Sequence, residues 1–145
     1  SWPELDFLVI DSPPGTGDEP LSVIQLLGGV DGAVIVTTPQ DVALSDVRRT
    51  VRFCEQLNVK MLGVVENMAA FKCPHCNEYI DIFKGQGADL IAKDYNIDVL
   101  GSIPIDPAVV TSGDAGRPYI YDYGKTEGGV KYEEIVDKLI SKVEK

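Results

Sequence analysis

The sequence predicts an α/β fold built on a doubly wound, mostly parallel sheet. Continuous apolar runs such as Gly32–Thr38 and Met61–Glu66 lack the alternation of a half-exposed strand, which is typical of strands buried on both faces. The amphipathic segment Asp41–Leu57 stands between these two runs, so a right-handed β–α–β unit is expected. The chain has 145 residues, of which 44% are hydrophobic and 25% charged. It is therefore long enough to form one compact domain with a sizeable core.

The first expected strand is Leu5–Asp11, and a loop rich in proline and glycine follows it directly. This order places the carboxylate of Asp11 at the C-terminal tip of a buried strand, where open α/β sheets bind their ligands. Gly15 in the loop would let the backbone come close to a phosphate. The alternative is a strand followed by an ordinary turn.

The remaining elements are expected in a regular order. They are a helix at Pro20–Leu27, strands at Gly32–Thr38 and Met61–Glu66 around the helix Asp41–Leu57, a short strand within Tyr79–Phe83, a helix at Gly87–Tyr95, a strand at Asp98–Ile103 and a final helix at Val130–Val143. The long helix should bury one apolar face made of Leu44, Val47, Val51 and Cys54. The final helix should turn five residues inward: Ile135, Val136, Leu139, Ile140 and Val143.

The stretch Ala70–Phe83 interrupts this rhythm as an inserted excursion and carries a C-x-x-C pair, Cys73 and Cys76. Two thiolates at this spacing can reach one metal ion or cluster, but a tetrahedral zinc site or a cubane cluster normally takes four ligands. Cys54 is expected to be a core thiol, and His75 is poorly placed to share a metal with its neighbour Cys76. The missing ligands are therefore expected from a second copy of the chain, related by a two-fold axis.

Three kinds of chemistry compete for the C-x-x-C pair. A thioredoxin-like redox pair is disfavoured because no clear helix begins at the motif. A zinc site joining two subunits and a bridging iron–sulfur cluster are equally consistent with the spacing, so both interpretations stay open.

Charge and cysteine content limit the classes of partner. The net charge of −10 argues against nucleic acid or an anionic membrane surface as the main partner. No apolar run approaches 18 residues, so no transmembrane helix is expected. An odd count of three cysteines fits a reducing, cytoplasmic environment.

A phosphate-binding loop is missing from the sequence. No lysine stands in a G-x-x-x-x-G-K-[ST] context, and the glycine-rich run Lys84–Gly87 follows no expected strand. The chain begins at Ser1 rather than at a methionine, which favours a missing N-terminal part.

Six motifs in order resemble the Mrp/ApbC-type iron–sulfur cluster carriers, which are deviant-Walker P-loop ATPases related to MinD and ParA. The resemblance runs from about Leu5 to about Tyr119 and rests on D-S-P-P-G-T-G-D, T-T-P-Q-D-V-A-L-S-D, G-V-V-E-N-M, C-P-H-C, G-S-I-P-I-D-P and S-G-D-A-G-R-P. It implies a sheet of the P-loop NTPase type. It also implies a homodimeric, ATP-dependent carrier that holds a 4Fe-4S cluster and passes it to apo-proteins.

The resemblance also assigns roles to individual residues. Asp11 would lie near Mg²⁺, and Gly15 would offer its backbone N–H to the γ-phosphate. Asn67 would hydrogen-bond the adenine edge, and the loop from Pro104 to Pro107, with Asp106 within it, would flank the base. Cys73 and Cys76 would be the bridging cluster ligands. Simpler alternatives exist: Asn67 could cap the turn after its strand, and the prolines could merely punctuate a loop.

This chain departs from the family pattern because it lacks the phosphate loop, its lysines and the segment that positions the attacking water. No catalytic residue is therefore assigned within it, and ATP hydrolysis by this chain alone is not expected. Residues 1–145 are interpreted as the C-terminal portion of a single P-loop NTPase-like domain. Two other functions remain as alternatives: a non-catalytic zinc- or partner-binding dimerisation module, and a MinD/ParA-like positioning ATPase. The latter is disfavoured because the last helix does not resemble a basic, membrane-seeking helix.

Overall fold

The computed structural model describes residues 3–13 and 15–144. Along the chain its elements are α1 (Asp18–Leu27), β1 (Ala33–Thr37), α2 (Asp41–Gln56), β2 (Met61–Lys72), β3 (Tyr79–Ile80), α3 (Gly87–Tyr95), β4 (Val99–Ile105), α4 (Pro107–Asp114), α5 (Tyr119–Tyr123) and α6 (Glu127–Val143). No helix in the described ranges is long and apolar enough to cross a bilayer.

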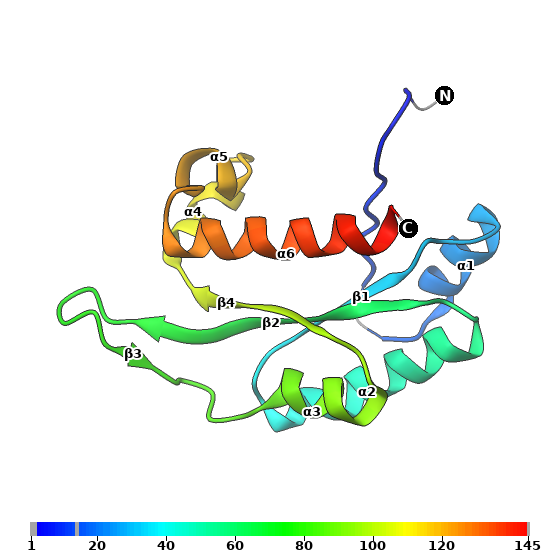
Figure 1. The fold of residues 1–145 in the computed structure, drawn as a ribbon, viewed down its shortest axis with the longest axis horizontal. Coiled ribbons are helices and arrows are strands. Elements are labelled where there is room, and N and C mark those ends of the chain that lie inside the picture. The colour runs from blue at the N-terminus through cyan, green and yellow to red at the C-terminus, as the bar shows by residue number, and fades with distance from the viewer. Residues whose placement is uncertain (1–2, 14, 145) are drawn as a thin grey trace.

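The sheet is mostly parallel, as the sequence predicts. Strand β2 lies between β1 and β4 and runs parallel to both, while β3 pairs antiparallel with the far end of β2. The carboxyl ends of β1, β2 and β4 therefore point toward the same edge of the sheet (Figure 1). Beyond that edge, β2 and β3 continue outward as a hairpin.

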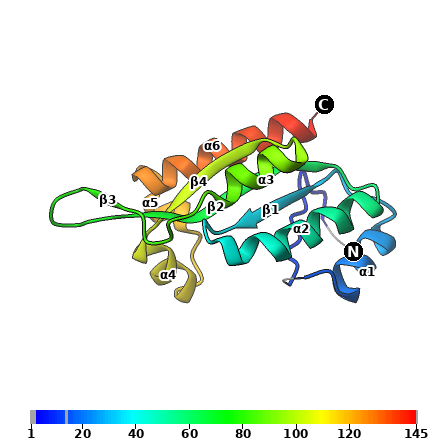
Figure 2. The same cartoon turned by 90° about the horizontal axis from the view of Figure 1, so that it is seen from below.

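Helices cover both faces of the sheet, which confirms the doubly wound arrangement (Figures 1 and 2). Helices α2 and α3 pack on one face through a buried cluster formed by Ile35, Leu44, Val47, Val51, Val64, Ala88 and Ile91. Helix α6 packs on the other face through Val65, Leu100, Ile103 and Ile135. The core is thus divided by the sheet into two apolar layers.

The predicted inner face of α2 is confirmed, whereas that of α6 is confirmed at Ile135 and Leu139, which pack in the core. All four residues assigned to the inner face of α2 are buried, and Cys54 is a free core thiol, 5% exposed. In α6, Ile135 is buried, but Val136 is 46% exposed, so its inward assignment is wrong. Successive helical residues are rotated by about 100°. With Ile135 facing the sheet, Val136 falls on the flank of the helix.

The prediction of a buried strand at Leu5–Asp11 is also wrong. This segment forms no ladder, and its apolar side chains are exposed, with Phe7 at 47% and Val9 at 90%. A buried strand needs hydrogen-bonding neighbours as well as an apolar sequence. Strand β1 pairs with β2, and no described strand lies beside its other edge. Asp11 therefore does not stand at the tip of a strand.

The glycine-rich run at residues 84–87 has a packing role. A Cβ atom on Gly85 would lie 1.6 Å from the carbonyl oxygen of Pro39, and one on Gly87 would lie 2.6 Å from that of Thr38. Because two backbones approach this closely, only glycine fits at both positions. The run brings the start of α3 against the end of β1.

Candidate functional site

Asn67 lies where β2 is distorted near the carboxyl edge of the sheet. The register between β2 and β4 shifts between Asn67 and Phe71, and Met68 has a left-handed φ of 57°. The Asn67 side-chain oxygen accepts the Met68 backbone N–H at 3.0 Å. The side-chain NH₂ of Asn67 donates no hydrogen bond to any described residue, so this group is available to a ligand. Strand bulges of this kind are frequent beside binding sites.

The loop after β4 is fixed by Asp106. One carboxylate oxygen caps α4 by accepting the Ala108 N–H at 2.8 Å, and the other accepts the Tyr119 hydroxyl at 2.6 Å. Burial, and next the hydrogen bond to Asp106, raise the pKa of the Tyr119 phenol. Both oxygens of Asp106 are thus engaged by the protein, and the residue acts first as a structural anchor for the loop.

A cavity of about 370 Å³ opens between this loop and the base of the hairpin. Pro104 and Asp106 line one side of it, and Lys72, Tyr79 and Glu127 line another. A larger hollow of about 650 Å³ lies farther along the carboxyl edge of the sheet. The structure therefore brings the predicted base-flanking loop next to the cysteine hairpin.

The expected ligand side chains do not all come together. Asn67 lines neither hollow, although its neighbour Glu66 lines the larger one. Asp11 is exposed in a segment outside the sheet, and Gly15 has a φ of 109° with open space where a Cβ would be. Pro104 lines the smaller hollow and Asn67 lies outside both, so the described residues do not gather the predicted base-binding groups around one cavity. They do not form a cradle for the phosphates of a nucleotide either.

The C-x-x-C pair occupies the turn of the β2–β3 hairpin, at the end that projects from the body (Figure 1). The Cys73 N–H donates to the Glu78 carbonyl, and the Asn77 N–H donates to the Cys73 carbonyl, both at 2.9 Å. Asn77 completes the turn with a φ of 59°. Cys73 is half-buried and Cys76 is exposed, and neither is in a disulfide.

The turn favours the thiolate form of Cys73. The backbone N–H of Cys76 lowers the pKa of the Cys73 thiol most, followed by the N–H of His75 and the thiol of Cys76. Hydrogen bonds of this kind favour the charged form of the acceptor. Burial has the opposite effect on Cys54, whose pKa is raised. The thiolate is the metal-binding form, which the turn favours at Cys73, whereas burial disfavours it at Cys54.

The hairpin contributes two ligands only. Within residues 3–13 and 15–144, no three His, Cys, Asp or Glu side chains gather in a way that could hold a metal ion. That further ligands come from a second copy of the chain stays a prediction.

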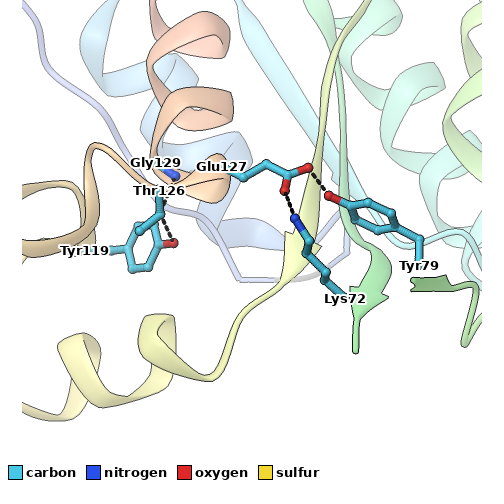
Figure 3. A network of polar contacts seen from close by, with 6 residues as sticks. All are labelled: Lys72, Tyr79, Tyr119, Thr126, Glu127 and Gly129. Carbon is cyan, nitrogen blue, oxygen red and sulfur yellow. Dashed lines mark hydrogen bonds and ion pairs between the residues drawn. The ribbon is translucent and has the colours of Figure 1, made fainter. Parts of the chain in front are cut away.

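A polar network that the sequence analysis missed joins the hairpin to α6 (Figure 3). Lys72 at the end of β2 forms an ion pair with Glu127 at 2.9 Å, and the Tyr79 hydroxyl donates to the other carboxylate oxygen. The Lys72 ammonium also lies 5.4 Å from the centre of the Tyr79 ring. Glu127 thus meets two hairpin residues, which lie 55 and 48 residues away in the sequence, beside the cysteine turn.

The same helix start is tied to the loop after β4. Thr126 is the N-cap of α6, accepting the Gly129 N–H at 3.2 Å, and its hydroxyl lies 3.0 Å from that of Tyr119. Gly128 allows this approach, because a Cβ there would lie 2.6 Å from the Tyr119 hydroxyl. A threonine immediately before an acidic residue was a capping signal that sequence inspection could have used.

Comparison with known proteins agrees with the predicted resemblance. The model of the ParA family described as "NUBPL iron-transfer P-loop NTPase" matches residues 1–140. The iron-sulfur cluster carrier protein of Methanocaldococcus jannaschii is 41% identical over 99% of this chain and 49% of its own length. The cytosolic Fe-S cluster assembly factor NUBP2 of Gallus gallus is also 41% identical, over 97% of this chain and 52% of its own.

Two solved structures share the fold. The nucleotide-binding protein of Archaeoglobus fulgidus, in complex with ADP, has a TM-score of 0.70 and 42% identity over 85% of this chain and 51% of its own. The cell division ATPase MinD of Pyrococcus furiosus has a TM-score of 0.72 at 21% identity, over 94% of this chain and 52% of its own, and supports the fold alone. The chain spans about half the length of the relatives it matches.

Proposed function

Because this chain belongs to the iron-transfer P-loop NTPase family, we propose that it is the cluster-holding part of an iron–sulfur cluster carrier. The observation that carries the proposal is the exposed turn in which Cys73 and Cys76 project from the body with one thiol pKa lowered. A cargo that must be handed to another protein needs ligands at the surface. A purely structural metal site, by contrast, is usually enclosed by the protein.

The proposed cargo is a 4Fe-4S cluster that bridges two chains, each giving Cys73 and Cys76. Four thiolates complete such a cluster, and no group of three or more possible metal ligands is found among the described residues of one chain. A two-fold axis through the cluster would make the chain a homodimer, with identical hairpins facing each other. Zinc at the same four sulfurs is the second candidate, since its tetrahedral site takes the same ligands.

We further propose that ATP and Mg²⁺ bind the complete protein at the carboxyl edge of the sheet. The free side-chain NH₂ of Asn67 would donate a hydrogen bond to the adenine edge. Pro104 and the loop that Asp106 holds would flank the base. Asp11 and Gly15 would serve the Mg²⁺ and phosphate side once the rest of the cradle is present. The relative from A. fulgidus, solved with ADP, supports a nucleotide at this fold.

Apo forms of iron–sulfur proteins are the proposed recipients, and the cytoplasm is the proposed location. The name of the M. jannaschii relative, a carrier protein, supports delivery, and the name of the G. gallus relative places that protein in the cytosol. The net charge of −10 supports protein recipients over nucleic acid or an anionic membrane.

Anaerobic reconstitution tests the carrier function. The chain is loaded with iron and sulfide, its visible absorption is recorded, and the loaded protein is mixed with an apo-ferredoxin whose own spectrum and activity report transfer. We expect broad sulfur-to-iron absorption that moves to the acceptor, and no loading of the Cys73→Ser chain. A colourless, zinc-loaded dimer that transfers nothing would instead indicate a dimerisation module.

The nucleotide proposal has its own test. ATP hydrolysis by this chain alone should equal the background, because the cationic phosphate loop that stabilises the transition state is absent from its sequence. ATPase activity that persists after repurification and co-elutes with the chain in size-exclusion chromatography would contradict the expectation that this chain alone does not hydrolyse ATP.

A further inference from the structure

The hairpin that carries the cysteines is weakly supported by its own strands. Strands β2 and β3 pair through two residue pairs only, Phe71 with Ile80 and Lys72 with Tyr79. Tyr79 and Ile80 are each 49% exposed, so little apolar contact holds β3 in place. A ladder this short is marginal by itself. The sheet holds the β2 arm as far as Phe71, which pairs with Ile105 of β4. Beyond that pair, side-chain contacts with another element add support to the turn.

Those contacts converge on Glu127, the first residue of α6 (Figure 3). Its Oε2 accepts from Lys72 Nζ at 2.9 Å, and its Oε1 accepts from the Tyr79 hydroxyl. Among the side-chain hydrogen bonds of the described residues, these two are the ones that link the hairpin to a different element. One donor comes from β2 just before Cys73, and the other comes from β3 just after the turn. A single carboxylate thus fastens both arms of the hairpin at its cysteine end.

The position of Glu127 is itself fixed. It directly follows Thr126, the N-cap of α6, whose hydroxyl lies 3.0 Å from that of Tyr119. Tyr119 in turn donates to Asp106 in the loop after β4. Consecutive residues at one helix start therefore anchor the cysteine hairpin and the proposed base-flanking loop.

We infer that Glu127 is a positioning residue that sets the orientation of the Cys73–Cys76 turn through Lys72 and Tyr79. This inference rests on the proposed function, in which the two cysteines are ligands. Glu127 touches no ligand itself. It presents the two thiolates in a fixed direction, so that a second copy can complete the ligand set without first ordering the hairpin. Preorganisation of this kind raises metal affinity because less freedom is lost on binding.

The test compares Glu127→Gln with Glu134→Gln in the full chain. Glu134 offers a matched control, because its ion pair with Lys131 lies on the same helix, spans the same 2.9 Å, and has the same side-chain exposures of 44% and 49%. Tyr79→Phe removes one donor of the hairpin contact and keeps its ring. Amide residual dipolar couplings report the orientation of residues 73–78 relative to α6. A Co²⁺ titration, monitored by thiolate-to-cobalt absorption, reports the metal affinity of the Cys73–Cys76 pair.

We expect Glu127→Gln to reduce the couplings of residues 73–78 by motional averaging and to leave those of α6 unchanged. Co²⁺ affinity should fall about tenfold, the lower end of the range for residues that orient metal ligands. Tyr79→Phe should give a smaller change in the same direction, and Glu134→Gln should give none.

The outcomes separate the inference from the proposed function. Unchanged couplings and unchanged Co²⁺ affinity in Glu127→Gln would overturn the positioning role while leaving the cysteines as ligands. Equal losses in Glu127→Gln and Glu134→Gln would overturn it too, because they would reveal a general charge effect. Absence of thiolate-to-cobalt absorption in the unmodified chain would contradict the proposed function, and the couplings would still decide whether Glu127 orients the turn.

Discussion

The hydroxyl of Tyr119 donates to a carboxylate oxygen of Asp106 across 2.6 Å, which joins helix α5 to the loop that ends β4. The other oxygen of Asp106 caps α4, so the carboxylate has no oxygen left without a protein donor. The Asp106 side chain therefore keeps the loop in place, and in the proposed nucleotide site the proline rings and backbone of the loop would be the groups that face the base.

Replacing Tyr119 with phenylalanine should destabilise the fold by about 1–2 kcal/mol, because a hydrogen bond to a half-buried carboxylate is lost. Tyr121→Phe provides the control, since Tyr121 is 78% exposed and its change should stay within about 0.5 kcal/mol. Urea unfolding at neutral pH measures both. Equal stability of the two variants would show that the bond to Asp106 contributes nothing.

The same bond predicts a loss of stability in alkali. Burial and Asp106 raise the pKa of Tyr119 in the folded chain. The contribution of Tyr119 to folding stability is therefore fully present at pH values below the ordinary tyrosine pKa of about 10. It is lost as the pH rises through the pKa that Tyr119 has in the folded chain. Stability should fall less between pH 9 and 11 in Tyr119→Phe than in the unmodified chain.

Cys73 should react with iodoacetamide at lower pH than Cys54. The N–H groups of Cys76 and His75 lower the pKa of Cys73, whereas burial raises that of Cys54. Only the thiolate is nucleophilic, so the pH of half-maximal rate should lie below about 8.5 for Cys73. Peptide mapping after timed alkylation of the metal-free chain measures each rate. A half-maximal pH for Cys73 at or above the value for a free thiol would rule out the turn geometry as a cause of activation.

Gly85→Ala should destabilise the chain by about 2 kcal/mol or more, since its Cβ would lie 1.6 Å from the Pro39 carbonyl oxygen and one backbone must move. Gly113→Ala provides the comparison. It lies inside α4, where a Cβ meets nothing within 4 Å, and should be neutral or stabilising by up to about 1 kcal/mol. Thermal and urea unfolding of both variants measure the difference. A Gly85→Ala chain as stable as Gly113→Ala would contradict the close approach.

Periodicity and continuous apolar runs located the strands and helices of the layered core, but β2 continues to Lys72, six residues beyond the predicted end at Glu66 and into the stretch expected to lie outside the sheet. Helix α3 spans Gly87–Tyr95 as predicted, and α2 begins at Asp41 and ends one residue before the expected end. These elements pack on one another, so their local pattern and their tertiary setting agree. Helices α4 and α5 were not predicted, because α4 is only eight residues long and α5 only five. The Asp106–Pro107 pair, an N-cap before a first-turn proline, was the signal for α4.

Sequence patterns fail where an element depends on a neighbour. The apolar run ending at Asp11 reads as a strand, yet it has no ladder in the described chain. Glu127 lies before the final helix expected from Val130, and its partners Lys72 and Tyr79 are 55 and 48 residues away, so no local pattern pointed to it. The cysteine pair was found from spacing alone, whereas the network that orients it is visible only in three dimensions.

The measurement that tests the central claim most directly is the number of metal centres per chain. Inductively coupled plasma metal analysis, combined with multi-angle light scattering, should be applied to the reconstituted chain and to its Cys73→Ser, Cys76→Ser and Cys54→Ser variants. One four-metal cluster, or one zinc ion, is expected per two chains. Either substitution in the hairpin should remove the metal and weaken the dimer, because metal binding and association are linked.

Cys54→Ser should keep the full metal content and lose about 1 kcal/mol of stability, since its thiol is buried in the core between α2 and the sheet. A centre bound by each single chain, or metal lost from Cys54→Ser, would contradict a site shared by two hairpins.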